Sequence, residues 1–160
     1  MYTKLFLAAA ILLLVGCGES APTASEGFHT ENYIEESDEN NHTVIYDVRQ
    51  NLEFVNSAQG CTPIHGTPED ALKNARYFCE NLRFFGYDDW RVPTLQEIER
   101  LSKGMDREGL VPFFTFKQCK RIVGVKQDGT LGNINTHNIK PKFAEVPLRL
   151  PAGVRCVRER

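Results

Sequence analysis

Hydrophobic and polar residues follow regular patterns from Thr43 onward. Residues 43–47 are mainly β-branched and aromatic, and Leu52-Glu53-Phe54-Val55 follows after a short polar turn, so we expect a strand pair to open the folded part. At Thr67 an N-cap residue, a proline and two acids favour a helix start. Small and apolar residues then recur at helical spacing towards Gly86, which predicts a helix with Cys79 on or beside its buried stripe.

A second helix is expected to begin at Thr94. Thr94 and Glu97 have the spacing of a capping box, and Pro93 is placed to pack against Ile98 as a hydrophobic staple. Apolar residues continue at helical spacing, and Gly104 is the expected C-cap, which gives a helix of roughly ten residues.

The last part of the chain predicts more strands. Apolar runs cover 113–116, 122–125 and 153–157, and Asp-Gly at 128–129 is typical of a hairpin turn. We expect 133–151, which holds three prolines, to be a long irregular loop. Strands, two helices and further strands predict an α+β fold with two helices packed on a mainly antiparallel sheet.

The N-terminus has the layout of an export signal. One positive charge precedes an apolar run that begins at Leu5, ends in Leu-Val-Gly-Cys at 14–17, and is too short to span a bilayer. This segment resembles a bacterial lipobox, which implies a signal peptide over residues 1–16 and a lipid on Cys17. The alternatives are a signal peptide cut elsewhere and an uncleaved anchor.

The remaining chain consists of an acidic segment followed by a mildly basic one. Between Gly18 and Thr43 there are seven acids and neither lysine nor arginine, so residues 17–43 are interpreted as the lipidated cysteine and a flexible acidic tether. Residues 44–160 are interpreted as one globular domain, and they carry 18 basic against 14 acidic residues.

The basic excess is concentrated late in the chain. Residues 100–160 hold 13 basic and five acidic residues, which indicates either an anionic partner or a solvated surface. Nucleic acid is not expected, because the chain is predicted to be exported and carries no nucleic-acid-binding motif. The candidate ligand contacts are Lys117, Lys120, Arg121, Lys126, Lys140, Lys142 and Arg149.

Four cysteines remain besides Cys17. Cys61, Cys79, Cys119 and Cys156 form an even set in an exported domain, which predicts two disulfides with three possible pairings. Zinc ligation is the weaker alternative, because no Cys-x-x-Cys pair is present.

Several motifs together resemble the Lcl C-terminal domain family, a domain of unknown function named for a collagen-like bacterial adhesin. The resemblance covers about Tyr46 to Arg158, and its motifs are Asp47 with Leu52-Glu53-Phe54, the spaced residues Ala71, Ala75, Cys79 and Leu82, Trp90-Arg91-Val92-Pro93-Thr94 with Glu97, and Val154-Arg155-Cys156-Val157-Arg158. It implies an exported domain with the layout of C-type-lectin-like and formylglycine-generating-enzyme-like folds. It also implies pairing of Cys79 with Cys156, which leaves Cys61 for Cys119. The chain departs from the family at Phe54, where tryptophan is usual, and at 113–116, where a Trp-Ser-Ser-like strand is expected.

Trp90 and Arg91 each have a structural and a functional interpretation. A tryptophan between two helices is best explained as core, with sugar stacking as the alternative. Arg91 is expected to form an ion pair or to donate to carbonyls, with ligand contact as the alternative.

No catalytic motif of a known class is present, so we expect neither an enzyme nor a cofactor nor a metal site. A paired-carboxylate site of Glu97 with Asp88 or Asp89 is the strongest catalytic alternative. We expect Glu97 to serve as a helix cap instead, and the two aspartates to form a turn.

The sequence therefore predicts a lipid-anchored, non-catalytic binding module of the bacterial cell envelope. Its expected partners are the membrane, through the lipid, and an anionic glycan or an envelope protein. Gly18 stands where an inner-membrane retention signal has aspartate, which favours the outer membrane. The alternative function is a periplasmic immunity or inhibitor lipoprotein that neutralises a toxin or a hydrolase.

Overall fold

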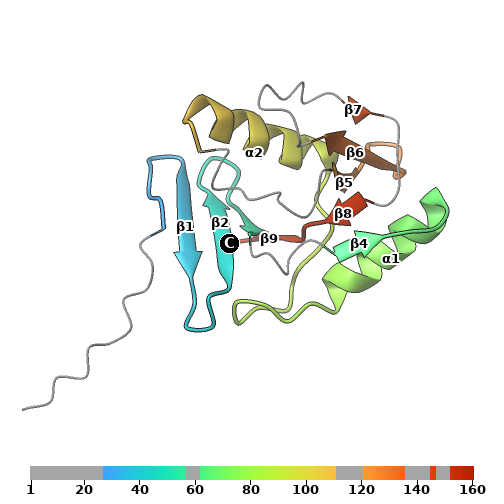
Figure 1. Ribbon diagram of the computed structural model, residues 1–160, viewed down its shortest axis with the longest axis horizontal. Helices are drawn as coiled ribbons and strands as arrows, with labels where there is room; N and C mark the ends of the chain where they lie inside the picture. Colours follow the sequence, from blue (N-terminus) through green and yellow to red (C-terminus); the bar gives the residue numbers. More distant parts are fainter. Residues whose placement is uncertain (1–26, 57–61, 111–120, 136–144, 147–151) are drawn as a thin grey trace, which may run out of the picture.

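A computed structural model describes residues 27–56, 62–110, 121–135, 145–146 and 152–160 (Figure 1). This part of the chain forms an α+β fold, as the sequence predicted, with two helices and two mainly antiparallel sheets. The four-stranded sheet has the order β1-β2-β3-β9 and the five-stranded sheet has the order β4-β8-β5-β6-β7. Only β5 and β8 pair in parallel among the described strands.

The elements have these bounds: β1 Tyr33–Ser37, β2 Thr43–Asp47, β3 Leu52–Val55, β4 Thr62–Ile64, α1 Pro68–Glu80, α2 Leu95–Arg107, β5 Arg121–Val125, β6 Leu131–Asn135, β7 Glu145–Val146, β8 Ala152–Val154 and β9 Val157–Glu159. The predicted strand pair at β2 and β3, the Asp-Gly hairpin between β5 and β6 and the starts of both helices are confirmed. The predicted strand at 113–116 lies outside the described residues.

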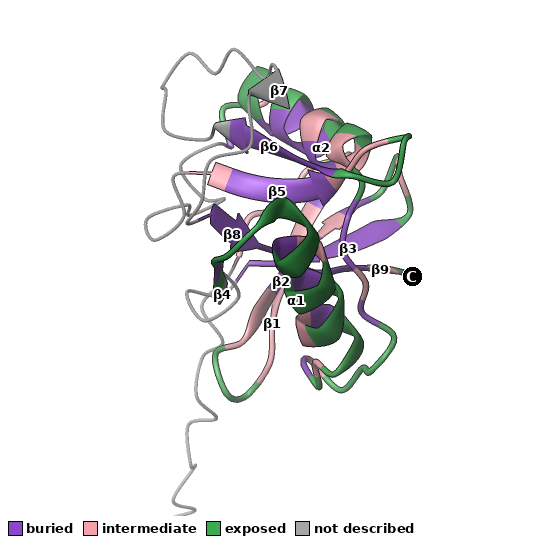
Figure 2. Cartoon of the chain, turned by 90° about the vertical axis from the view of Figure 1, so that its right-hand side faces the viewer, coloured by how far each residue is buried: buried purple, intermediate pink, exposed green. Residues whose placement is uncertain are grey.

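The two helices pack in separate cores, and each core also contains residues of both sheets. Ile45 and Phe54 lie in a core with α2, whereas their neighbours Val44 and Val55 lie in a second core with α1. Successive residues of a strand point to opposite faces, so β2 and β3 are buried on both sides. Figure 2 shows the matching pattern on α1, with a buried inner side and an exposed outer side.

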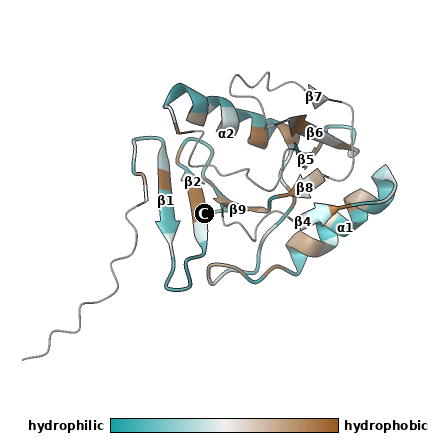
Figure 3. Ribbon diagram, viewed as in Figure 1, coloured by the Kyte–Doolittle hydropathy of each residue, from teal (hydrophilic) through white to brown (hydrophobic). Residues whose placement is uncertain are grey.

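The predicted tether is wrong for the residues that the structure describes, because residues 33–37 form β1 and pair with β2. Tyr33 is fully buried in the core and anchors this strand. The acidic side chains have partners far along the chain: Glu36 pairs with Arg160, and Glu35 accepts a hydrogen bond from Asn56. Figure 3 shows that much of β1 is hydrophilic, which is why composition alone suggested a tether.

Three other predictions need correction. The first helix ends at Glu80 rather than near Gly86, and Asn133–Asn135 belong to β6 rather than to a loop. The expected last strand, 153–157, is two strands in different sheets, because the chain leaves β8 after Val154 and joins the four-stranded sheet at Val157.

Gly104 is not a C-cap, because α2 continues three residues beyond it. A Cβ atom built at Gly104 would lie 1.7 Å from the hydroxyl of Tyr33 and 2.2 Å from a guanidinium nitrogen of Arg49. The absence of a side chain therefore allows β1 and the turn after β2 to approach α2 closely.

Gly104→Ala is expected to lower the free energy of unfolding by about 1 to 3 kcal/mol, even though alanine is the better helix former, because the new methyl group overlaps buried atoms. Chemical denaturation in a double-mutant cycle with Tyr33→Phe measures this effect. The buried Tyr33 hydroxyl has no hydrogen-bond partner among the described residues, so its removal should relieve part of the overlap. An equal cost of Gly104→Ala in both backgrounds would show that the hydroxyl is not the obstacle.

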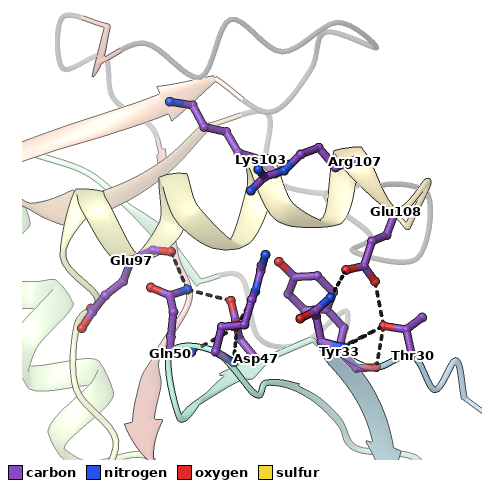
Figure 4. Close-up of polar contacts among 10 residues, drawn as sticks. Thr30, Tyr33, Asp47, Gln50, Glu97, Lys103, Arg107 and Glu108 are labelled. Atoms are coloured by element: carbon purple, nitrogen blue, oxygen red, sulfur yellow. Dashed lines mark hydrogen bonds and ion pairs between the residues drawn. The ribbon is translucent and has the colours of Figure 1, made fainter.

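A polar seam joins α2 to the strands beneath it (Figure 4). The Gln50 side-chain amide donates to Asp47 over 2.8 Å and to the Glu97 carbonyl over 3.3 Å. At the other end of the helix, Glu108 accepts 2.7 Å hydrogen bonds from Thr30 and Asn32. Burial raises the pKa of Asp47, although hydrogen bonds from Gln50 and Arg49 oppose the shift.

One disulfide lies within the described residues, and it joins Cys79 on α1 to Cys156 just before β9. The pairing implied by the family resemblance is thus confirmed. Both cysteines are buried in the core beside α1. Cys61 and Cys119 lie outside the described residues.

Candidate functional site

A groove of about 570 Å³ lies between the first turn of α2 and the β5–β6 hairpin. Leu95, Val125 and Ile134 supply its apolar surface. The polar residues that line it are Thr94, Gln96, Glu99, Lys126, Gln127 and Asp128. A concave site with apolar walls and a few polar groups is the usual form of a small-ligand site.

Two facing glycines set the distance between the helix and the hairpin. Gly124 on β5 pairs with Gly132 on β6. A Cβ atom at Gly124 would lie 2.8 Å from the backbone nitrogen of Leu95, and one at Gly132 would lie 2.4 Å from the Leu95 side chain. The first turn of α2 therefore rests directly on the hairpin, where the Val125 N–H also donates to the Pro93 carbonyl over 2.9 Å.

The capping box fixes the helix end beside the groove. The Thr94 hydroxyl accepts from the Glu97 N–H, and the Glu97 carboxylate accepts from the Thr94 N–H over 2.7 Å. Arg91 holds the same carboxylate with two nitrogens, at 2.9 and 2.8 Å. Burial alone would raise the pKa of Glu97, but the hydrogen bonds from Arg91 and Thr94 hold it below its ordinary value.

Glu97→Gln is expected to lower the free energy of unfolding at pH 7 by about 1 to 2 kcal/mol, because it removes a charge-assisted pair and weakens the cap. The stabilisation from Glu97 is complete above its unfolded pKa of 4.5 and is lost as the pH falls through its lower folded pKa. The difference between wild type and variant should therefore shrink on acidification.

Urea denaturation between pH 3 and pH 7 measures this difference. Glu99→Gln on the same helix is the control, because Glu99 pairs with Lys103 at the surface and such pairs contribute at most about 1 kcal/mol. A Glu97→Gln effect that is constant over this pH range contradicts the assigned pKa shift.

The groove also carries charged groups of both signs. Glu99 forms an ion pair with Lys103, one turn further along α2. Hydrogen bonds from the Thr130 hydroxyl and N–H lower the pKa of Asp128, so its carboxylate stays ionised. Lys126 is the basic residue among the lining residues, and Glu99 and Asp128 are the acidic ones. The groove is therefore polar without being strongly basic or acidic.

The structure shows that the predicted motif residues have different roles. Trp90 is 2% exposed and donates from its indole nitrogen to the Phe84 carbonyl over 3.2 Å, so the core interpretation is confirmed and the ring is not available for sugar stacking. Arg91 forms the expected ion pair, Pro93 is buried, and Thr94 lines the groove.

Two of the predicted basic contacts can be placed. Lys126 lines the groove, whereas Arg121 is half-buried at the opposite end of β5. The other five, Lys117, Lys120, Lys140, Lys142 and Arg149, lie outside the described residues.

The proposed carboxylate pair is not assembled. Glu97 binds Arg91, Asp88 lies 3.7 Å from Arg83, and Asp89 binds Arg158 at 2.7 Å. Hydrogen bonding to Arg158 lowers the pKa of Asp89. No group of three or more metal-ligating side chains occurs in the part of the chain that the structure describes.

Most groove residues were not predicted as site residues. Leu95 belongs to the apolar pattern that predicted the helix after Thr94, and Asp128 to the predicted hairpin turn. Gly124 and Gly132, on either side of the Asp-Gly turn, were the sequence signal that could have indicated the groove. Glycine within a strand can mark a position where another backbone approaches closely.

Comparisons with protein-family models, curated proteins and solved structures found no match to this chain. Neither of the two described helices combines the length and the apolar composition that a membrane span requires.

Proposed function

We propose that this protein is a lipid-anchored, non-catalytic binding module of the bacterial cell envelope. The lipobox-like sequence that ends at Cys17 supports export and anchoring, and Gly18 favours the outer membrane. The disulfide between α1 and the chain before β9 is consistent with an oxidising compartment and with a C-type-lectin-like layout.

The groove beside α2 is the single observation that carries the binding role. Its volume is in the range of small-ligand sites, and its walls combine apolar side chains with amides, carboxylates and one amine. Amide and carboxylate groups can hydrogen-bond to sugar hydroxyls, and apolar walls can pack against the C–H faces of a sugar ring. An anionic glycan would use all four kinds of group, with the Lys126 amine as the partner of its acidic substituent.

Binding of the purified full chain to an immobilised sulfated polysaccharide tests the proposal. We expect binding that weakens with added salt, and a loss of about tenfold or more in Lys126→Glu, since a favourable charge becomes a repulsive one. Lys73→Glu is the matched control, because Lys73 is exposed on α1 and does not line the groove.

Two outcomes would redirect the proposal. Unchanged binding by Lys126→Glu, with a loss on charge reversal at Lys117, Lys120 and Arg121, assigns the glycan to a different surface. Recovery of one stoichiometric protein from an envelope extract, with no glycan binding, favours the immunity or inhibitor role.

A further inference from the structure

The turn between β1 and β2 carries an acceptor sequence for N-linked glycosylation. Asn41, His42 and Thr43 form the Asn-x-Ser/Thr tripeptide in which a transferase attaches a sugar to the asparagine. Asn41 is the only asparagine in the 160 residues with serine or threonine two positions later. Glu39 is an acidic residue two positions before it.

Asp38 fixes the backbone of this turn. Its carboxylate accepts hydrogen bonds from the N–H groups of Asn40 and His42, over 2.9 and 2.8 Å, and contacts the His42 ring nitrogen at 2.8 Å. Asn41 has a φ of 57°, the left-handed conformation that asparagine tolerates better than most residues. The turn thus holds the acceptor in a tight bend.

The flanking residues point the bend into solvent. The His42 ring packs against Phe84 with a centroid distance of 4.7 Å, whereas Glu39, Asn40 and Asn41 are exposed. The Asn41 backbone N–H donates to the Asp38 carbonyl over 3.0 Å, whereas its side-chain amide makes no hydrogen bond to any residue that the structure describes. Figure 1 shows the turn at the end of the hairpin, away from α2 and from β5 and β6.

Thr43 is also within reach of an enzyme. It forms the terminal pair of the hairpin with Ser37, and on the β3 side its carbonyl accepts from the Asn56 N–H over 2.8 Å. Contacts at the end of a strand open at a lower free-energy cost than those in its middle. The acceptor tripeptide can therefore enter a transferase while the rest of β2 stays paired.

We infer that Asn41 is a site of N-linked glycosylation. In the transfer, the Asn41 side-chain nitrogen forms a bond to the anomeric carbon of an oligosaccharide carried on a polyprenyl diphosphate. The bond between that carbon and the diphosphate oxygen breaks, and the lipid diphosphate leaves with the electron pair. The amide nitrogen loses one proton to a carboxylate of the transferase. The modification in a cell rests on the proposed export, since the transferase faces the periplasm.

Incubation of the purified, folded full chain with a bacterial oligosaccharyltransferase and its lipid-linked donor tests the site independently of export and of ligand binding. Intact-mass and peptide-mass spectrometry are expected to show one glycan on Asn41 in the wild type. Asn41→Gln and Thr43→Ala should carry none. Asn40→Gln is the matched control, because it changes the adjacent exposed amide and keeps the acceptor tripeptide.

Two results overturn the inference. One is a wild-type chain that stays unmodified while a synthetic peptide of residues 36–46 is glycosylated in the same reaction, since the folded turn is then not an acceptor. The other is the same glycan mass on Asn41→Gln.

Discussion

Replacing Cys79 and Cys156 together by alanine is expected to lower the free energy of unfolding by about 4 to 5 kcal/mol. The two residues are 77 apart in the sequence, and a crosslink over a loop of that length removes about this much conformational freedom from the unfolded chain. Urea denaturation of the oxidised wild type and of the double variant, followed by the fluorescence of Trp90, gives the difference.

Reduction of the wild-type protein separates the stabilisation that comes from the crosslink from the stabilisation that comes from packing of the two cysteine side chains. Both sulfur atoms are buried, so the alanine variant also loses a small amount of core volume. Reduced wild type should be slightly more stable than the double variant and much less stable than the oxidised protein. A difference of less than 1 kcal/mol between the oxidised and reduced proteins would contradict the expected stabilisation.

Trp90→Ala is expected to lower the free energy of unfolding by about 3 to 5 kcal/mol, because it opens a large cavity in the core beside α1. The ring packs edge-on against Phe84 with a centroid distance of 6.0 Å, and its N–H satisfies the Phe84 carbonyl. Trp90→Phe keeps part of this packing and should cost less. Far-UV circular dichroism is the measurement, since Trp90 is the only tryptophan.

Tyr77→Ala provides the control for loss of an aromatic ring. Tyr77 is 71% exposed on α1, so its removal should change the free energy of unfolding by no more than about 0.5 kcal/mol. Similar costs for Tyr77→Ala and Trp90→Ala would contradict the placement of Trp90 in the core.

Local signals predicted the helix starts and the tight turns, because these depend on residues close together in the sequence. Thr67 and Thr94 accept hydrogen bonds from N–H groups three residues later, as their positions indicated. Gly129 adopts a positive φ in the hairpin turn that Asp-Gly predicted. The disulfide needed more than local information, and its pairing came from a resemblance over the whole domain.

Features that depend on distant partners were missed. β1 was assigned to a tether because its segment has many acids and neither lysine nor arginine, whereas the asparagine and the arginine that bind these acids lie 21 and 124 residues away. Gly104 and the glycines of the hairpin fitted their usual roles in caps and turns. Only the tertiary structure shows that Gly104 leaves room for Tyr33 and that Gly124 and Gly132 leave room for Leu95.

The attachment of β1 to α2 has a mechanical consequence. A pull on the N-terminal end of the described chain reaches β1 through residues that are themselves attached. The Glu35 N–H donates to the Phe28 carbonyl over 2.9 Å, and Thr30 and Asn32 each donate to one oxygen of the Glu108 carboxylate. The contacts of Thr30 and Asn32 with Glu108 precede β1 along the chain. Without them, an outward pull would break the hydrogen bonds between β1 and β2 one pair at a time. Glu108 therefore shares the load with the contact between Phe28 and Glu35 before the pairs between β1 and β2 open.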